Sequence, residues 1–137
     1  HDFLSNTYNM KMVKPVKIPK DSKFNDLRKL LPSEFEWITT KKRLVLETQL
    51  QHHCVWSYAS EISDDHCAIY SYVDTDGSKT SNICNTPQRY TIEFRYDTQK
   101  KEYYIKQIQG KYNAVDTATM KIFIENILKQ TTLQKIA

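Results

Sequence analysis

The chain has 137 residues and a formal net charge of +4, and a length of this order favours one domain built around one core. Its two glycines are too few for a glycine-rich phosphate loop, and neither the GxxxxGK nor the GxGxxG pattern occurs. No apolar run approaches the roughly 18 residues that span a bilayer, so we expect no membrane partner. The sequence begins at His1, and we expect it to be part of a larger chain.

The three cysteines have an odd count and no framework spacing, which indicates a reducing compartment and predicts a cytoplasmic location. Two His-Cys pairs, His53–Cys54 and His66–Cys67, are zinc ligands by type. No C-x-x-C or H-x3-H spacing accompanies them, however. We therefore expect no metal site, and we expect no cofactor.

Residues 1–33 are predicted to form a basic extended leader that ends in a short helix. The stretch KMVKPVKIPKDSK places a lysine at every third residue, at Lys11, Lys14, Lys17, Lys20 and Lys23. Three residues per turn is the polyproline II period, so these ammonium groups would line one edge of an extended segment and could follow a phosphate backbone. We expect residues 11–20 to form no helix. The alternative is a solvated linker kept extended by proline and charge repulsion.

The short helix is predicted after Asp21 or Ser22, with Phe24 and Leu27 on one face and Pro32 beyond its end. Residues 35–40 suit a short strand. Thr39 or Thr40 then caps a predicted helix whose stripe repeats every four residues as far as residue 62, either unbroken or interrupted near the histidines. The members of that stripe are Leu46, Leu50, Cys54, Tyr58 and Ile62.

Three strands are predicted at residues 66–73, 89–96 and 103–109, followed by a final helix. Matching apolar faces pairs Tyr96 with Tyr103, Phe94 with Ile105, and Ile92 with Gln107. The stripe of the final helix is Met120, Phe123, Ile124, Ile127 and Leu128. The predicted fold class is α+β: a small antiparallel sheet of three to four strands, over residues 34–137, covered by helices on one side.

The run LETQLQHHCVWSY, residues 46–58, resembles the signature of PcfJ-like proteins, in which a Glu-Gly pair and a leucine precede His-Cys-Val-Gly-Ser-Tyr. Later parts agree in order: Thr91 and Glu93 in a T-x-E strand, and Gln107, Gly110 and Asn113 in a Q-x-x-G-x-x-N turn. The resemblance implies a protein of plasmids, phages and related mobile elements. Thr48 and Trp56 replace family glycines, which predicts a more continuous helix.

Cys54 is a candidate nucleophile, since a helix N-terminus or a nearby imidazolium lowers a thiol pKa. The candidate catalytic cluster adds the polar residues that match the family pattern: His53, Glu93, Gln107 and Asn113. The alternatives are a buried core cysteine without a disulfide and a structural hydrogen-bond network. We expect His53 to point at the sheet and to reach residues 105–114, while His52 points to solvent.

Lys106 and Lys111 complete the candidate nucleic-acid contacts. Tyrosines near them could stack bases, namely Tyr70, Tyr72, Tyr103, Tyr104 and Tyr112, although strand tyrosines are also ordinary core residues. The leading hypothesis is an accessory or nucleic-acid-associated module of a mobile element, binding DNA or RNA. One alternative is an enzyme that uses Cys54 with histidine assistance, and another is a protein-interaction module of a larger effector.

Overall fold

The computed structural model describes residues 13–51, 56–75, 87–110 and 117–136. Four antiparallel strands form one sheet in the order β1-β2-β3-β4. The strands are β1 (Glu36–Trp37), β2 (Ala68–Asp74), β3 (Gln88–Asp97) and β4 (Glu102–Gly110). The helices are α2 (Asn25–Leu30), α3 (Lys41–Gln51), α4 (Ala59–Ser63) and α5 (Thr117–Ile136), with a 3₁₀ turn, η1, at Trp56–Tyr58. The predicted α+β class and antiparallel sheet are confirmed.

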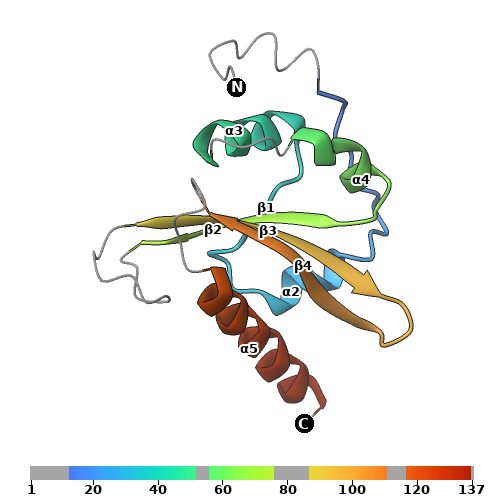
Figure 1. Cartoon of the computed structure of the whole chain (residues 1–137). Helices are drawn as coiled ribbons and strands as arrows, with labels where there is room; N and C mark the ends of the chain where they lie inside the picture. Colours follow the sequence, from blue (N-terminus) through green and yellow to red (C-terminus); the bar gives the residue numbers. More distant parts are fainter. Residues whose placement is uncertain (1–12, 52–55, 76–86, 111–116, 137) are drawn as a thin grey trace.

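Helices cover both faces of this sheet, with α3 and α4 on one face and α2 and α5 on the other (Figure 1). The prediction of helices on one side only is therefore wrong. It followed from the single apolar face of β3, whose odd-numbered residues 91, 93 and 95 are polar. In the structure Thr91 and Glu93 are buried, and they face α3 and α4 as part of a polar layer.

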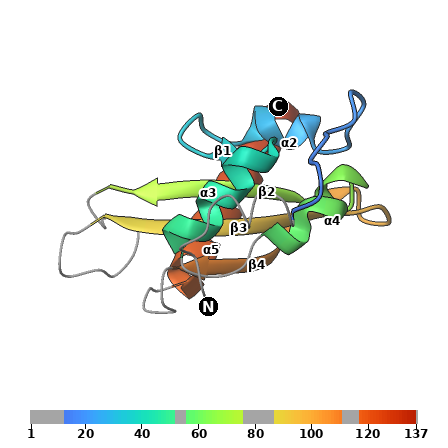
Figure 2. The same ribbon diagram turned by 90° about the horizontal axis from the view of Figure 1, so that it is seen from above.

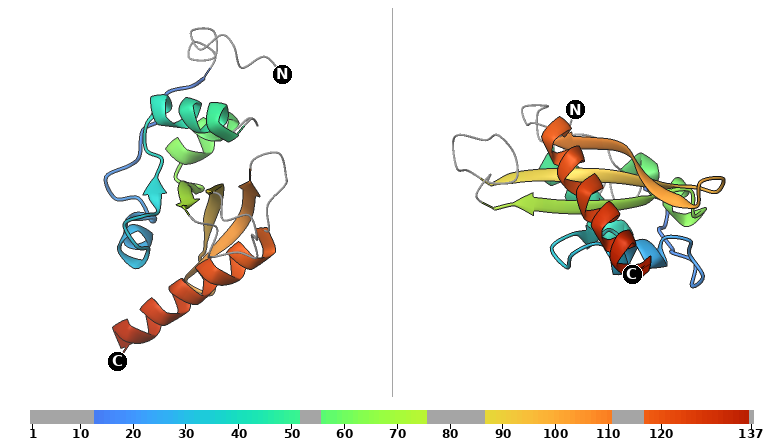
Figure 3. Two further views of the ribbon diagram at one scale, coloured as in Figure 1. Left: turned by 90° about the vertical axis from the view of Figure 1, so that its left-hand side faces the viewer. Right: turned by 90° about the horizontal axis from the view of Figure 1, so that it is seen from below.

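The apolar face of the sheet carries the larger core. Tyr90, Ile92 and Phe94 of β3 are fully buried there, and Met120 and Ile124 of α5 pack onto them. Figure 3 shows α5 crossing the strands obliquely on this face. The predicted stripe of the last helix is confirmed, since its remaining members, Phe123, Ile127 and Leu128, pack against the same core. Phe24 and Leu27 from the α2 region are also buried here.

The register of the β3–β4 hairpin was predicted correctly at one end only. Tyr96 pairs with Tyr103 and Phe94 with Ile105, as expected. Beyond Phe94 the register shifts, so that Glu93 pairs with Gln107 and Ile92 with Ile108. Lys106 is the extra residue of this β-bulge, and an extra residue moves the following side chains to the opposite face. The predicted pairing of Ile92 with Gln107 is therefore wrong.

Helix α3 begins after Thr40, whose hydroxyl accepts a hydrogen bond from the Arg43 backbone N–H at 3.1 Å. The predicted stripe does not define its buried side, because Leu46 is 44% and Leu50 is 37% exposed. The buried side instead carries Leu44, Val45, Glu47, Thr48 and Gln51. The helix also does not continue unbroken to Ile62, since η1 is a 3₁₀ turn and α4 follows as a separate helix.

Candidate functional site

The basic strap, residues 13–23, contains no helix or strand and carries exposed lysines and inward-facing apolar residues; it turns at Pro19–Ser22, where the Ser22 N–H donates to the Pro19 carbonyl at 3.1 Å. Val13 is buried, and Val16 and Ile18 pack on the same small core, which includes Ile38 and Ile62. The lysines of the strap are exposed at every third position: Lys14, Lys17, Lys20 and Lys23. The expected absence of helix is confirmed for residues 13–20, and Lys11 lies outside the described residues.

Hydrogen bonds hold the strap against α4 and the turn that follows it. The Ser63 hydroxyl accepts from the Lys17 backbone N–H at 3.1 Å and donates to the Pro15 carbonyl at 3.2 Å. The Asp65 carboxylate accepts from the Ser22 hydroxyl at 2.5 Å and from the Lys23 backbone N–H at 2.9 Å. The strap thus packs on the same core as α3 and α4, while a domain boundary at residue 33 stays a prediction.

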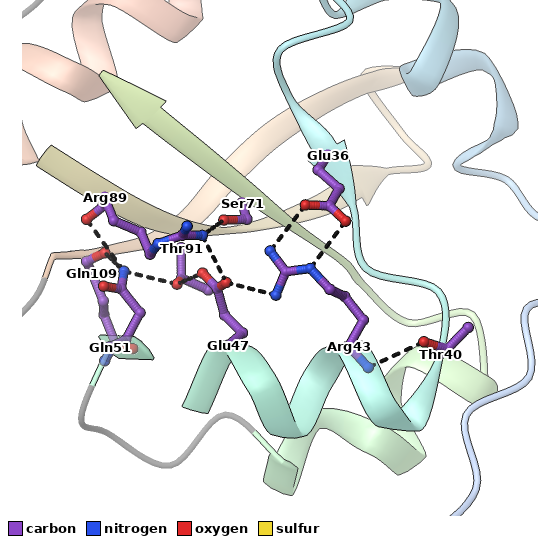
Figure 4. Close-up of polar contacts among 9 residues, drawn as sticks. All are labelled: Glu36, Thr40, Arg43, Glu47, Gln51, Ser71, Arg89, Thr91 and Gln109. Carbon is purple, nitrogen blue, oxygen red and sulfur yellow. Dashed lines mark hydrogen bonds and ion pairs between the residues drawn. The ribbon is translucent and has the colours of Figure 1, made fainter. Parts of the chain in front are cut away.

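A polar layer lies between α3 and the sheet, and its centre is the carboxylate of Glu47, which is fully buried. Figure 4 shows Glu47 pointing from α3 toward β3. One carboxylate oxygen accepts from Arg43 at 3.0 Å and from Arg89 at 3.3 Å, and the other accepts from the Thr91 hydroxyl. A buried charge is tolerated when it is paired and hydrogen-bonded in this way.

Gln51 extends this layer to the end of β4. Its amide nitrogen donates to the Thr91 hydroxyl at 3.0 Å and to the carbonyls of Arg89 and Gln109 at 3.3 Å each. We expected the HHC segment to be tied to the QIQGKYN turn through His53, which lies outside the described residues. Gln51, two positions earlier, makes one such connection by donating to the Gln109 carbonyl (Figure 4), and Tyr58 makes another to Gln107.

Arg43 continues the layer to β1, where its guanidinium donates to the two carboxylate oxygens of Glu36 at 2.9 and 3.0 Å. This hydrogen bond lowers the pKa of Glu36 below its ordinary value. The charges alternate along the series Glu36, Arg43, Glu47 and Arg89, and Arg89 also donates to the Ser71 hydroxyl at 2.7 Å. Because every charge is paired, the layer joins α3 to the sheet and offers no free acid or base.

Two residues of the predicted catalytic cluster come together, next to α4. Glu93 is buried, receives a hydrogen bond from Arg95 at 2.7 Å, and pairs across the strands with Gln107. Gln107 is exposed, so its predicted place on the apolar face is wrong; the bulge moved it. The Tyr58 hydroxyl donates to Gln107 at 3.2 Å. The pKa of Tyr58 is raised to about 12, mainly because its hydroxyl is desolvated and secondly because of a hydrogen bond with Glu93.

The remaining members of that cluster, His53, Cys54 and Asn113, lie outside the described residues, as does Lys111. The described cysteine, Cys67, is free and buried, and burial raises the pKa of its thiol to about 12. A thiol in that state is a packing group and not a nucleophile. In the part of the chain that the structure describes, no three His, Cys, Asp or Glu side chains are grouped to hold a metal ion.

The predicted stacking surface is largely absent among the described tyrosines. Tyr70 and Tyr72 are buried, at 1% and 6% exposure, so neither can stack a base. Tyr103 is half-buried and its hydroxyl donates to the Lys23 carbonyl, which makes it a support for the strap. Tyr104 is 41% exposed, and Tyr112 lies outside the described residues. Of the two interpretations, the core role is confirmed for Tyr70 and Tyr72, because helices cover both faces of the sheet (Figure 1).

Sequence reasoning found the lysines of the strap but missed the residues that fix it. Ser63 and Asp65 are more than 40 positions from their partners in the strap. Local sequence patterns do not predict contacts over such separations. Lys106 is exposed on β4, and α4 lies between the strap and β4 (Figures 2 and 3). Lys106 and the strap therefore do not belong to one continuous row.

Comparisons with protein-family models, with curated proteins and with solved structures find no match for this chain. None of the helices in the described ranges is both long and apolar enough to cross a membrane. What the geometry itself offers is a small α+β domain with one exposed, fixed row of lysines and a closed, charge-neutral polar layer.

Proposed function

We propose that the chain is a nucleic-acid-associated accessory module that contacts the phosphate backbone of DNA or RNA through its basic strap. The resemblance to PcfJ-like proteins supports placing it in a mobile genetic element. The observation that carries the proposal is the fixed period of the strap. Lys14, Lys17, Lys20 and Lys23 are all exposed, while the backbone N–H groups of Lys17 and Lys23 anchor the strap to the domain.

Fixing the backbone matters for the strength of binding. A flexible lysine-rich linker must lose chain entropy when it lies along a polyanion, and that cost weakens binding. Here Val13 is buried and Lys17 and Lys23 are held by backbone hydrogen bonds, so part of that ordering is complete before the ligand arrives. Lys14 and Lys17 precede the turn at Pro19–Ser22, and an extended backbone would separate them by about 9 Å, at roughly 3.1 Å per residue.

Contacts of this kind recognise charge and not sequence. Lysine is a point charge without the bidentate geometry that reads base edges, so these side chains position the domain on phosphates. Four phosphate contacts would make the logarithm of the binding constant fall with the logarithm of salt concentration with a slope of about −3 to −4. We expect weak binding with little preference for sequence.

The test compares two triple variants that lose the same charge. One replaces the strap lysines Lys14, Lys17 and Lys20 by glutamine. The other replaces Lys29, Lys121 and Lys129, which are exposed on the helices of the opposite face. Fluorescence anisotropy with labelled DNA and RNA oligonucleotides over a salt series gives each slope.

We expect the strap variant to reduce the magnitude of the slope by about 2 to 3, which corresponds to three lost phosphate contacts. The matched variant should change affinity much less, because its lysines lie outside the strap, on α2 and α5. Equal losses in the two variants would mean that only net charge matters, and the strap would then have no special role.

A further inference from the structure

We infer that Asp65 is a positioning residue for nucleic-acid binding: it fixes the C-terminal end of the basic strap so that the lysine row is held ready for a polyanion. This inference rests on the proposed function of the strap and names the residue that holds the strap in position. Asp65 lies in the turn between α4 and β2. Its carboxylate contacts no lysine side chain of the strap in the described structure; it binds the hydroxyl of Ser22 and the backbone of Lys23.

The turn that carries Asp65 is itself well fixed. The backbone N–H groups of Asp64, Asp65 and His66 donate to carbonyls of α4 at 2.9 to 3.1 Å. Asp65 has a φ of 61°, a left-handed conformation that aspartate and asparagine tolerate better than most residues. Both oxygens of its carboxylate are therefore presented to the strap from a rigid support.

The place of this contact along the strap gives it influence over several lysines. Ser63 holds the backbone at Pro15 and Lys17, and Asp65 holds the Ser22 hydroxyl and the Lys23 backbone N–H. Lys20 lies between these two attachment points. From the other side, Tyr103 of β4 donates its hydroxyl to the Lys23 carbonyl. Loss of the Asp65 contacts would release the C-terminal end of the strap. Binding would then have to order that end of the chain, and the lost conformational entropy would weaken the affinity.

A carboxylate in this place has two opposed effects on a polyanion. Its negative charge repels phosphate, so its removal should tighten binding if charge alone decides. Its hydrogen bonds order the strap, so their removal should weaken binding if position decides. Neutralising Asp65 therefore distinguishes the two effects: tighter binding indicates that charge decides, and weaker binding indicates that the position of the strap decides.

The test uses Asp65→Asn with Asp64→Asn as its matched control. Both changes add the same charge at neighbouring positions of one turn, and asparagine suits the positive φ of residue 65. Asp64 is exposed, and its backbone N–H donates to the Ser60 carbonyl at 2.9 Å. Ser22→Ala removes the hydroxyl that donates to Asp65 and accepts from the Phe24 N–H, without any change of charge.

We expect Asp65→Asn and Ser22→Ala to weaken binding of a labelled oligonucleotide by about threefold to tenfold, while Asp64→Asn binds as well as the wild type or better. Hydrogen exchange at the Lys23 amide should quicken in the first two variants and not in the third. Thermal unfolding of each variant shows whether the fold is intact. Should Asp65→Asn fail to fold, Ser22→Ala decides alone.

The inference is overturned if Asp65→Asn binds the oligonucleotide with the same affinity as Asp64→Asn, or if Ser22→Ala binds it with the same affinity as the wild type. Neither result contradicts the proposed function. A wild-type chain that shows no salt-dependent binding to DNA or RNA overturns the proposed function itself. The two failures are therefore distinct.

Discussion

The Thr91 hydroxyl of β3 donates a buried hydrogen bond to the carboxylate of Glu47 of α3, across 44 positions of the sequence. This contact fixes which side of α3 faces the sheet. A helix that packs through a carboxylate and an amide turns its leucines at positions 46 and 50 outward, which reverses the usual arrangement of a surface helix. The polar layer is thus the reason for the exposed leucines.

Replacing Glu47 by alanine should lower the free energy of unfolding by about 2 to 4 kcal/mol, because Arg89 and Thr91 lose a buried partner. The adjacent change Leu46→Ala should cost less than about 0.5 kcal/mol, since that side chain is substantially exposed. Urea unfolding of both variants, followed by circular dichroism, measures the difference. Similar costs for the two substitutions would show that Glu47 does not hold α3 to the sheet.

The orientation of α3 can also be checked with identical chemistry at two positions. Leu44 is fully buried and Leu50 is 37% exposed. We expect Leu44→Ala to cost about 2 to 4 kcal/mol through lost burial and a cavity. Leu50→Ala should cost less than about 1 kcal/mol. A larger loss of unfolding free energy for Leu50→Ala than for Leu44→Ala would contradict the structure. It would indicate that the four-residue stripe is the buried side of α3.

The ion pair between Glu36 and Arg43 should make stability depend on pH on the acid side. The hydrogen bond from Arg43 holds the pKa of Glu36 below its ordinary value of 4.5, so folding favours the ionised form. Its contribution is fully present above the unfolded pKa and is lost as the pH falls through the folded pKa.

Because Glu36 is more than half exposed, the effect is small and screened by salt. Glu36→Gln should flatten the fall of the unfolding temperature between about pH 5 and pH 3 relative to the wild type. The exposed Glu34, changed to glutamine, is the control. An unchanged acid profile for Glu36→Gln would show that the pair contributes nothing.

Cys67 should be inert to alkylation in the folded protein. Burial, aided by the negative charge of Glu93, raises the pKa of its thiol to about 12, so almost no thiolate exists near neutral pH. A variant with serine at positions 54 and 84 isolates this thiol. It should react with iodoacetamide only after unfolding in guanidinium chloride. Fast reaction of the folded variant would contradict the packing described here.

Local patterns accounted for the elements but not for their contacts. Alternation of apolar residues was enough to predict the pairing of Phe94 with Ile105, because each strand has one apolar face there. The bulge at Lys106 leaves no mark in that alternation, so Gln107 was assigned to the wrong face. The period of three in the strap was visible because its lysines recur at every third residue.

The polar layer and the anchors of the strap were not predictable in the same way. The leucines at 46 and 50 form a better apolar stripe than the true buried side of α3, which includes Glu47 and Gln51. Only the position of Arg89 and Thr91 on β3 makes that side the stable one. Asp65 likewise acts through partners far away in sequence, and its role depends on a turn conformation that one residue type does not reveal.

The most direct test of the central claim, that the strap contacts the nucleic-acid backbone, is a nuclear magnetic resonance titration of the chain with a short oligonucleotide at low salt. Amide shifts should change along residues 13–23, most strongly around Lys14, Lys17 and Lys20, and the changes should reverse when salt is added. Shifts confined to α2 and α5, or no shifts at any oligonucleotide concentration, would contradict the account.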